Sequence, residues 1–232
     1  MLTAAPAEAQ PAVSRPVKNE AVADRAKAAE PVFWVDPGDI QSKDLFYGPG
    51  GETGQPKLPF TYVKEDKGGT SPKFGVEDAS GEKWKAKLGV ETKPETVASR
   101  ILWATGFAAN TNYVVPETTV AGLDVKQKRG KELIGPGGRI TNVRVQRASK
   151  GWEKVGNWNW RDGKNKGRRE FNGLRVMMAV LSNWDLKGEN NAIFAEKKDP
   201  ARVFYATSDV GASFGMTGRS YTDERTKNNV VA

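Results

Sequence analysis

The sequence predicts an α+β fold, in which short antiparallel hairpins combine with two amphipathic helices. Strand-forming residues flank a turn at 78–81, and two further short strands are expected at 192–194 and 203–206. Apolar residues recur at helical spacing over two other stretches, 94–105 and 170–182. Hairpins and helices in this arrangement are typical of antiparallel sheets with helices packed against them.

The first hairpin pairs residues 74–76 with residues 84–88 across the turn Asp78–Gly81. Alternation along its second strand separates an apolar face from a face of lysines. The lysines are Lys83, Lys85 and Lys87. This face lines either a phosphate cleft or water, and both interpretations remain open.

The helix that follows is expected to begin near Pro94, a residue that suits the first turn of a helix. Glu95 complements the positive end of the helix dipole. The predicted apolar face holds Val97, Ile101 and Ala104 or Thr105. Beyond this helix we expect a short strand at 113–115, stopped by Pro116, and an alternating strand at 140–145.

The second helix is preceded by a basic segment, 151–169, which carries three of the seven tryptophans. One interpretation is a solvated insertion whose tryptophans form a small satellite core. The other is a nucleic-acid-binding surface, because Arg, Lys and aromatic side chains contact phosphates and bases. The apolar face of the helix itself is predicted to hold Phe171, Leu174, Met178 and Leu181.

The absence of histidine and cysteine from the 232 residues excludes several kinds of chemistry. A Ser-His-Asp triad, an imidazole base and the usual zinc ligands are all missing. Catalysis would therefore rest on carboxylates, amides, hydroxyls, lysine or arginine, with Mg²⁺ as the cation that suits oxygen ligands. No apolar run is long enough to cross a bilayer. The net charge of +8 indicates either a solubilising surface or attraction to polyanions.

Three side chains in the last third of the chain form a pattern typical of phosphoryl transfer. Asp185 and Asn190 lie five residues apart on one loop, and Asp209 begins an Asp-x-Gly sequence after the last strand. Phosphoryl transfer needs a carboxylate to meet the incoming hydroxyl and oxygen ligands to hold magnesium against the phosphates. Gly211 is expected to give the backbone freedom to bring Asp209 inward. Alternatively, these Asp and Asn residues only shape turns.

Upstream residues supply the complementary cations. Lys87, near the end of a hairpin strand, is expected to reach the α- and β-phosphates of a nucleotide, with Glu95 or the nearby Glu91 as its partner. A flexible loop before the hairpin would bring backbone amides and hydroxyls to the same phosphates. Its candidate nucleotide-binding residues are Gly69, Thr70, Ser71 and Lys73.

This order of motifs resembles the HipA-like branch of the protein-kinase-like folds, which is related to phosphoinositide kinases, over roughly residues 68–215. The resemblance implies a two-lobe architecture, with an antiparallel-sheet N-lobe and an incomplete helical C-lobe. It also implies ATP and Mg²⁺ as ligands, and phosphoryl transfer to an unidentified hydroxyl of a protein, lipid or small molecule. By the resemblance, Asp185 is the catalytic base, Lys87 the phosphate contact, and Asn190 and Asp209 the magnesium ligands.

The chain departs from that family pattern in two places. Trp184 and Lys187 stand near Asp185, where the family has a histidine or arginine, and only 23 residues follow Asp209 where the family continues into several helices. A C-terminally truncated member is therefore expected. Two alternatives remain: a catalytically inactive pseudokinase or nucleotide-binding module, and a basic nucleic-acid-binding protein.

Composition and motifs together predict six consecutive parts. In order, these are a disordered Ala/Pro-rich tail (1–30), an irregular Gly/Pro-rich lead-in (31–67), an N-lobe of hairpin, helix and strands (68–147), a basic tryptophan-bearing insertion (148–169), a catalytic helix, loop and metal-binding segment (170–215) and a polar tail (216–232). The run Ala7-Glu8-Ala9 resembles a signal-peptidase site. Both a cytoplasmic and an exported protein are compatible with the sequence.

Overall fold

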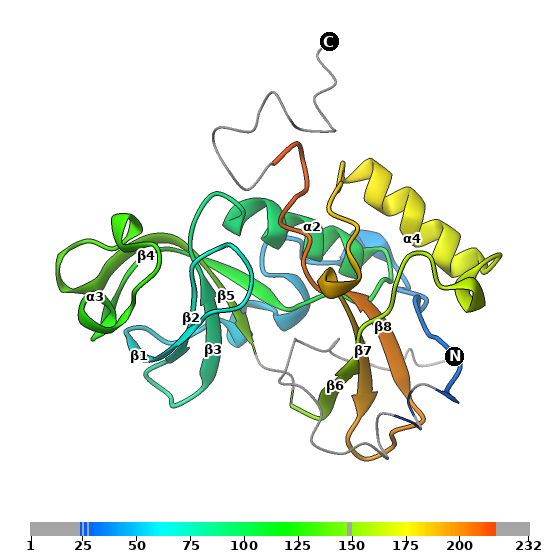
Figure 1. Ribbon diagram of the computed structural model, residues 1–232, viewed down its shortest axis with the longest axis horizontal. Helices are drawn as coiled ribbons and strands as arrows, with labels where there is room; N and C mark the ends of the chain where they lie inside the picture. Colours follow the sequence, from blue (N-terminus) through cyan, green and yellow to red (C-terminus); the bar gives the residue numbers. More distant parts are fainter. Residues whose placement is uncertain (1–23, 25, 27, 148–149, 217–232) are drawn as a thin grey trace, which may run out of the picture.

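The computed structural model describes residues 24, 26, 28–147 and 150–216. Within them, five strands close into a barrel and three form a second sheet (Figure 1). Helix α2 (Thr92–Ala104) packs on the outside of the barrel, and helix α4 (Arg169–Val180) covers the second sheet. The α+β class is confirmed. The further expectation of a kinase-like two-lobe architecture stays a prediction.

The barrel differs from the expected antiparallel sheet in being closed. Its strands are β1 (Phe60–Asp66), β2 (Lys73–Glu77), β3 (Lys83–Lys87), β4 (Asn112–Ala121) and β5 (Arg139–Arg147), in the spatial order β1-β2-β3-β5-β4. Neighbours are antiparallel except at the closure, where β1 and β4 run parallel and pair Phe60 with Val120. Closure removes the exposed strand edges of an open sheet.

The apolar faces of the strands fill the barrel, so the lysine face of β3 points outward. The interior includes Phe74, Trp84, Ala86, Val143 and Val145, all at most 4% exposed. Along the opposite face, Lys83 is exposed, whereas Lys87 is buried. The lysine face therefore runs from solvent at one end into a charged cluster at the other, beside the N-terminal end of α2.

Two predictions about these strands are wrong. The lead-in 31–67 contains the barrel strand β1, because Phe60 and Tyr62 point into the barrel core and Thr61 between them faces outward. The strand predicted to stop at Pro116 instead continues to Ala121 as part of β4. The edge of β4 facing away from β5 has no partner strand at this proline, and an edge tolerates the missing N–H.

The buried face of α2 also differs from the predicted one. Val97 is 47% exposed, whereas Ala98 and Leu102 are buried in the core shared with α4, and polar residues of α2 are buried as well. Glu95 and Ser99 face the barrel strands, where the Ser99 hydroxyl accepts a hydrogen bond from the Asn112 side chain at 3.0 Å. Periodicity favours apolar stripes, so it missed a helix that packs through buried polar groups.

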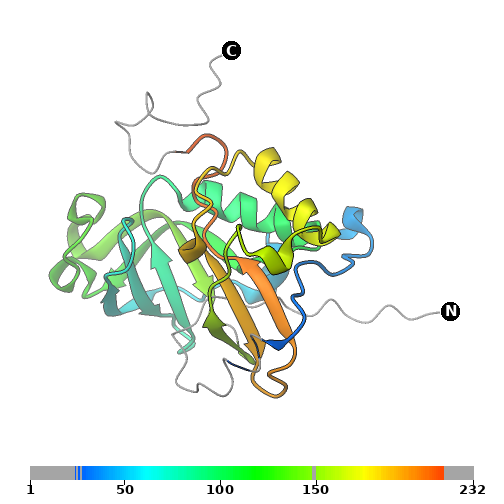
Figure 2. The same ribbon diagram turned by 45° about the vertical axis from the view of Figure 1, so that its right-hand side comes forward.

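The basic segment 148–169, expected to be an insertion, contributes one strand to the second sheet. Strand β6 (Trp152–Gly156) pairs antiparallel with β7 (Asn191–Glu196), which pairs with β8 (Val203–Thr207) (Figure 2). Trp158 is 1% exposed in the core between this sheet and α4. Its ring lies 5.3 Å from that of Phe33. The predicted apolar face of α4 is confirmed.

The remaining described segments are short. They comprise helix α3 (Leu123–Lys126) and the 3-10 turns Ile40–Ser42, Gly48–Gly50, Glu52–Gly54, Lys131–Leu133, Pro136–Gly138, Gly163–Asn165 and Gly188–Asn190. None of the helices in the described part of the chain has the length and apolar character needed to span a membrane. The predicted tails 1–30 and 216–232 lie almost wholly outside the described residues, apart from a few such as Ala26, which is buried in the core.

Candidate functional site

A cavity of about 260 Å³ lies where the loop before β2 faces the loops around β7 and β8. It brings together residues far apart in the chain. Those predicted from sequence are Gly69, Thr70, Ser71, Lys73, Asp185, Asn190 and Asp209, and those not predicted to line it are Glu91, Lys187, Glu189 and Ala212. Lys87 and Glu95 are absent from the wall because they are buried behind it, at 1% exposure each.

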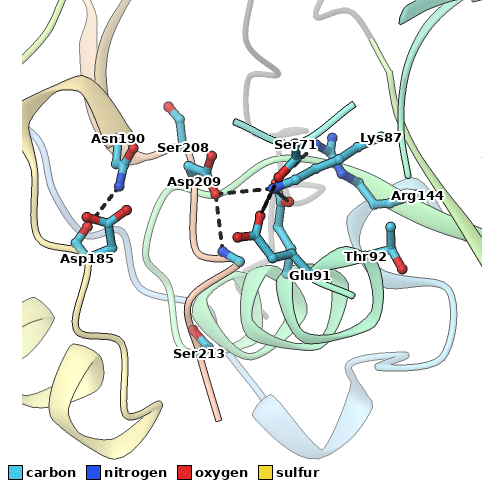
Figure 3. Close-up of polar contacts among 12 residues, drawn as sticks. Ser71, Lys87, Glu91, Thr92, Arg144, Asp185, Asn190, Ser208, Asp209 and Ser213 are labelled. Carbon is cyan, nitrogen blue, oxygen red and sulfur yellow. Dashed lines mark hydrogen bonds and ion pairs between the residues drawn. The ribbon is translucent and has the colours of Figure 1, made fainter. Parts of the chain in front are cut away.

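Lys87 is held by three carboxylates (Figure 3). Its Nζ lies 2.5 Å from Glu91 Oε2, 2.9 Å from Glu95 Oε2 and 3.6 Å from Asp209 Oδ1. Burial by itself lowers the pKa of Lys87, but the charges of Glu95, Asp209 and Glu91 outweigh it and raise that pKa above its ordinary value. The ammonium therefore stays charged at every physiological pH.

Glu95 links Lys87 to a second buried cation that the sequence did not reveal. Its Oε1 lies 3.2 Å from Arg144 Nη2, and the side chains of both residues are at most 3% exposed. Arg144 stands directly across the sheet from Lys87, because the β3–β5 register pairs the two residues. Arg144 can be assigned to the site only once the order of the strands is known. With Glu95 shared by two cations, Lys87 is fixed in position by paired charges in a dry environment.

Asp209 lies between Lys87 and Asn190, at the join of the two halves of the site (Figure 3). The backbone N–H groups of Ser208 and Asp209 donate to the carbonyl oxygen of Asn190 at 2.7 and 3.0 Å. Burial acts to raise the pKa of Asp209, but Lys87 and the N–H of Gly211 lower it below its ordinary value. The carboxylate is therefore ionised at neutral pH. Part of its side chain, 39%, is exposed to solvent.

Asp185 and Asn190 are fixed relative to each other by a hydrogen bond. The Asn190 side-chain amide donates from Nδ2 to the carbonyl oxygen of Asp185 at 2.8 Å. The Asp185 carboxylate pairs with Lys187 Nζ, also at 2.8 Å, and this contact raises the pKa of Lys187. Lys187 is 65% exposed, so the pair is open to solvent on the cavity side.

The donor set suits a hard cation such as Mg²⁺. With Nδ2 of Asn190 engaged, the amide oxygen Oδ1 has no hydrogen-bond partner within the described residues. Asp209 uses Oδ1 for both of its side-chain contacts, so among the same residues Oδ2 is unpartnered. One neutral and one anionic oxygen are ligands that Mg²⁺ accepts when phosphate and water complete its shell. The described residues contain no cluster of three or more acidic, His or Cys side chains that would hold a metal alone.

The loop before β2 carries the other predicted phosphate contacts. Gly69 adopts φ +65°, and a Cβ at that position would lie 3.1 Å from Lys73 Nζ, so the lysine folds over the loop. Burial and the neighbouring Lys85 and Lys87 lower the pKa of Lys73. Lys73 has no ion-pair partner within the described residues. Arg129 steadies the loop by donating from Nη1 to the carbonyl oxygen of Gly69 at 2.8 Å.

Position 211 requires glycine for a different reason from the one predicted. Its backbone does not need glycine for a left-handed conformation, since its φ lies outside that region. A Cβ at Gly211 would instead lie 2.9 Å from Glu91 Oε2 and 3.0 Å from Glu91 Cβ. Glycine at this position therefore makes room for Glu91 beside Asp209.

A larger groove of about 620 Å³ lies on the other side of the turn between β3 and α2. Leu88, Val90, Leu133 and Ile134 contribute apolar surface to it. None of the residues predicted from sequence to act in chemistry lines this groove. The smaller, more polar cavity is therefore the candidate site.

Comparison with protein-family models, with curated proteins and with solved structures gives no significant match. The geometry of the site is therefore the only basis for assigning a function.

Proposed function

We propose that this chain is an ATP- and Mg²⁺-dependent phosphotransferase with a kinase-like site. The observation that supports this most strongly is the meeting of two groups of residues at one cavity. Lys87, fixed by Glu95, lies behind one wall, and Asp185, Asn190 and Asp209 line another. Phosphoryl transfer needs fixed cations to bind the phosphates and free oxygen atoms to bind magnesium and accept the proton, and the two walls supply these groups.

Each residue has a distinct role in this proposal. Lys87 and Lys73 bind phosphate oxygens, with the backbone of Gly69 and the hydroxyls of Thr70 and Ser71 as further donors. Asn190 and Asp209 would hold Mg²⁺, which when bound neutralises negative charge on the phosphates. Glu95 orients Lys87 through the buried contact at 2.9 Å.

The chemical step transfers the terminal phosphoryl group of ATP to a hydroxyl. The hydroxyl oxygen forms a bond to the γ-phosphorus while the bond from that phosphorus to the bridging oxygen breaks and ADP leaves. Asp185 accepts the proton of the hydroxyl. Lys187 Nζ lies 2.8 Å from Asp185 Oδ1, so the lysine must move aside for the hydroxyl to reach the carboxylate. The acceptor belongs to a protein, a lipid or a small molecule.

The second candidate is a nucleotide-binding module without transfer, and one specific observation favours it. The carboxylate of Asp185, the proposed base, is already paired with Lys187 Nζ at 2.8 Å, and a neighbouring ammonium makes a carboxylate less able to accept a proton. The nucleic-acid alternative loses support. Of the three tryptophans that suggested it, Trp152 and Trp158 are 9% and 1% exposed and cannot stack on bases, and Trp160 packs partly buried against the core.

The proposal is tested by ADP formation from Mg-ATP in the presence of a Ser/Thr peptide mixture, phosphoinositide vesicles or polyols. Asp185→Asn should abolish turnover and leave nucleotide affinity within about twofold, because a residue that acts only in the chemical step changes kcat alone. Asp124→Asn, an exposed change on α3, is the control and should be fully active. Nucleotide binding without turnover in the wild type would select the second candidate. An Asp185→Asn variant with undiminished turnover would remove Asp185 as the base.

A further inference from the structure

Glu91 stands at the centre of the ligand-free site, and the roles above leave it unexplained. Its Oε2 lies 2.5 Å from Lys87 Nζ and accepts a hydrogen bond from the Ser71 hydroxyl at 3.0 Å. The same oxygen lies in the notch left by Gly211. One carboxylate oxygen thus binds Ser71 in the loop before β2, binds the buried Lys87, and lies beside Gly211 (Figure 3).

Those contacts are the ones a phosphate oxygen would make. Ser71 and Lys87 are the hydroxyl and the ammonium assigned above to the phosphates of ATP, and Glu91 lines the same cavity. The Ser71 hydroxyl has a single hydrogen to donate, and Glu91 accepts it, while Glu91, Glu95 and Asp209 together surround the three N–H donors of Lys87. A phosphate that enters must therefore displace Glu91 or bind beside its negative charge, and like charges held in contact repel.

Glu91 differs from Glu95 in the features that would let it move. The Glu95 side chain is 2% exposed and forms ion pairs with Arg144 as well as Lys87, whereas that of Glu91 is 17% exposed and, among the described residues, forms an ion pair only with Lys87. Glu91 occupies the N-cap position of α2 without a capping hydrogen bond from its side chain, and it follows Gly89, whose φ is +102°, by two residues. When Glu91 withdraws, Lys87 keeps Glu95 and Asp209, so the lysine is not left as an unpaired buried charge.

We propose that Glu91 is an internal counter-anion that takes the place of a phosphate beside Ser71 and Lys87 and gives way to the phosphates of the nucleotide. This inference rests on the proposed function, since it assumes that a phosphoanhydride binds here. Withdrawal of Glu91 would release Ser71 and Lys87 together, so that both donors become available in one step. Glu91 therefore sets the affinity for phosphates, and through it the selectivity for ligands that carry enough negative charge to compete.

The test is a titration calorimetry series with Mg-ATP and with Mg-tripolyphosphate as a probe of the phosphates alone. Glu91→Gln should lower the dissociation constant of both ligands about tenfold, because the variant removes the competing charge and keeps the shape of the side chain. Glu189→Gln is the matched control, since Glu189 is an exposed acid on the wall of the same cavity and is not an ion-pair partner of Lys87. That control should change either affinity by less than about twofold, because an exposed charge is screened by salt.

The outcomes separate the two proposals. Tighter binding in Glu91→Gln and not in Glu189→Gln supports the inference, as does binding that appears only in Glu91→Gln. Wild-type binding that Glu91→Gln leaves unchanged or weakens overturns the inference and leaves the proposed function standing. If neither protein binds either ligand, both proposals fail. A Glu91→Gln chain that does not fold also overturns the inference, because an anion that must leave on binding cannot be essential to the fold.

Discussion

The barrel side of the site and the loop side use charge in opposite ways. On the barrel side, Glu95, Lys87 and Arg144 are at most 3% exposed, and each contacts at least one group of opposite charge. On the loop side, Asp185 and Asp209 are 24% and 39% exposed, and side-chain oxygens of Asn190 and Asp209 have no partner within the described residues. On the barrel side, each of these buried charges is paired with a charge of opposite sign. The loop side is fixed through its backbone and leaves its oxygens available to a ligand.

This contrast separates residues that hold the fold from residues that serve the chemistry. A buried charge that loses its partner destabilises the protein strongly, whereas an exposed carboxylate contributes little to folding. Substitutions on the barrel side are therefore expected to act on stability first. Substitutions on the loop side should act on ligand binding or turnover and leave folding nearly unchanged.

The largest effect on stability is expected from Glu95→Gln. The change removes the charge that compensates both Lys87 and Arg144 in a buried setting. We expect a loss of about 3–5 kcal/mol in the free energy of unfolding, measured by urea denaturation. Glu117→Gln, which breaks the exposed pair with Arg139, serves as the control and should show no resolvable change. Equal effects of the two changes would contradict the contrast.

Outside the site, the buried carboxylate of Asp78 in the turn between β2 and β3 predicts a dependence of stability on pH. It accepts hydrogen bonds from the Ser80 hydroxyl at 2.7 Å and from Trp84 Nε1 at 3.0 Å, among others. Burial acts to raise the pKa of Asp78, but these donors lower it far below its usual range. A depressed pKa adds stability above the unfolded-state value near 4, and this stability is lost as the pH falls toward the folded-state value.

Asp78→Asn should accordingly cost about 2 kcal/mol at pH 7, the typical effect of hydrogen bonds to a charged group. Urea unfolding of both proteins at pH 7 and pH 3 checks this. The difference between them should narrow at pH 3, where the wild type begins to lose its advantage. A difference that widens as the pH falls would show that the sign of the shift is wrong.

Asp209→Asn is expected to have a smaller effect on the ligand-free protein, at most about 1 kcal/mol, because the carboxylate is partly exposed and Lys87 keeps Glu91 and Glu95. Chemical denaturation without nucleotide measures it. A loss as large as that of Glu95→Gln would move Asp209 to the structural side of the comparison.

The smallest effect is expected from Asp185→Asn. Its carboxylate contacts only the exposed Lys187 among the described residues, so the free energy of unfolding should change by less than about 0.5 kcal/mol. The unfolding midpoint of the ligand-free variant, compared with that of wild type, is the measurement. A destabilised Asp185→Asn would mean that a loss of turnover in this variant reports misfolding.

The success of sequence prediction differed between the two sides in a physically instructive way. Asp185, Asn190 and Asp209 were predicted together because their spacing along the chain places them on two loops joined by one hairpin, and the structure brings them to one cavity. Lys87 and Glu95 were predicted as a pair for a similar reason, since a strand end and the next helix start are close in sequence.

What sequence could not supply depended on strand order and packing. Arg144 joins the site only because β5 lies next to β3, an order that local patterns do not encode. Barrel closure between β1 and β4 and the burial of Trp158 depend likewise on contacts between distant segments. Glu91 was considered only as an alternative partner for Lys87. Its contact with Ser71 and the role of Gly211 in accommodating it required three-dimensional distances.

The central claim is that the two sides form one magnesium-dependent nucleotide site, and thermal unfolding tests it most directly. Mg-ATP at about 100 times its dissociation constant adds about 2.7 kcal/mol of stability. That should raise the unfolding midpoint of a chain this size by about 5–10 °C. We predict that wild type shows this shift only when Mg²⁺ is present, and that Asp209→Asn loses it while it remains folded. The same midpoint with and without Mg-ATP in wild type, or an undiminished shift in Asp209→Asn, would contradict the claim.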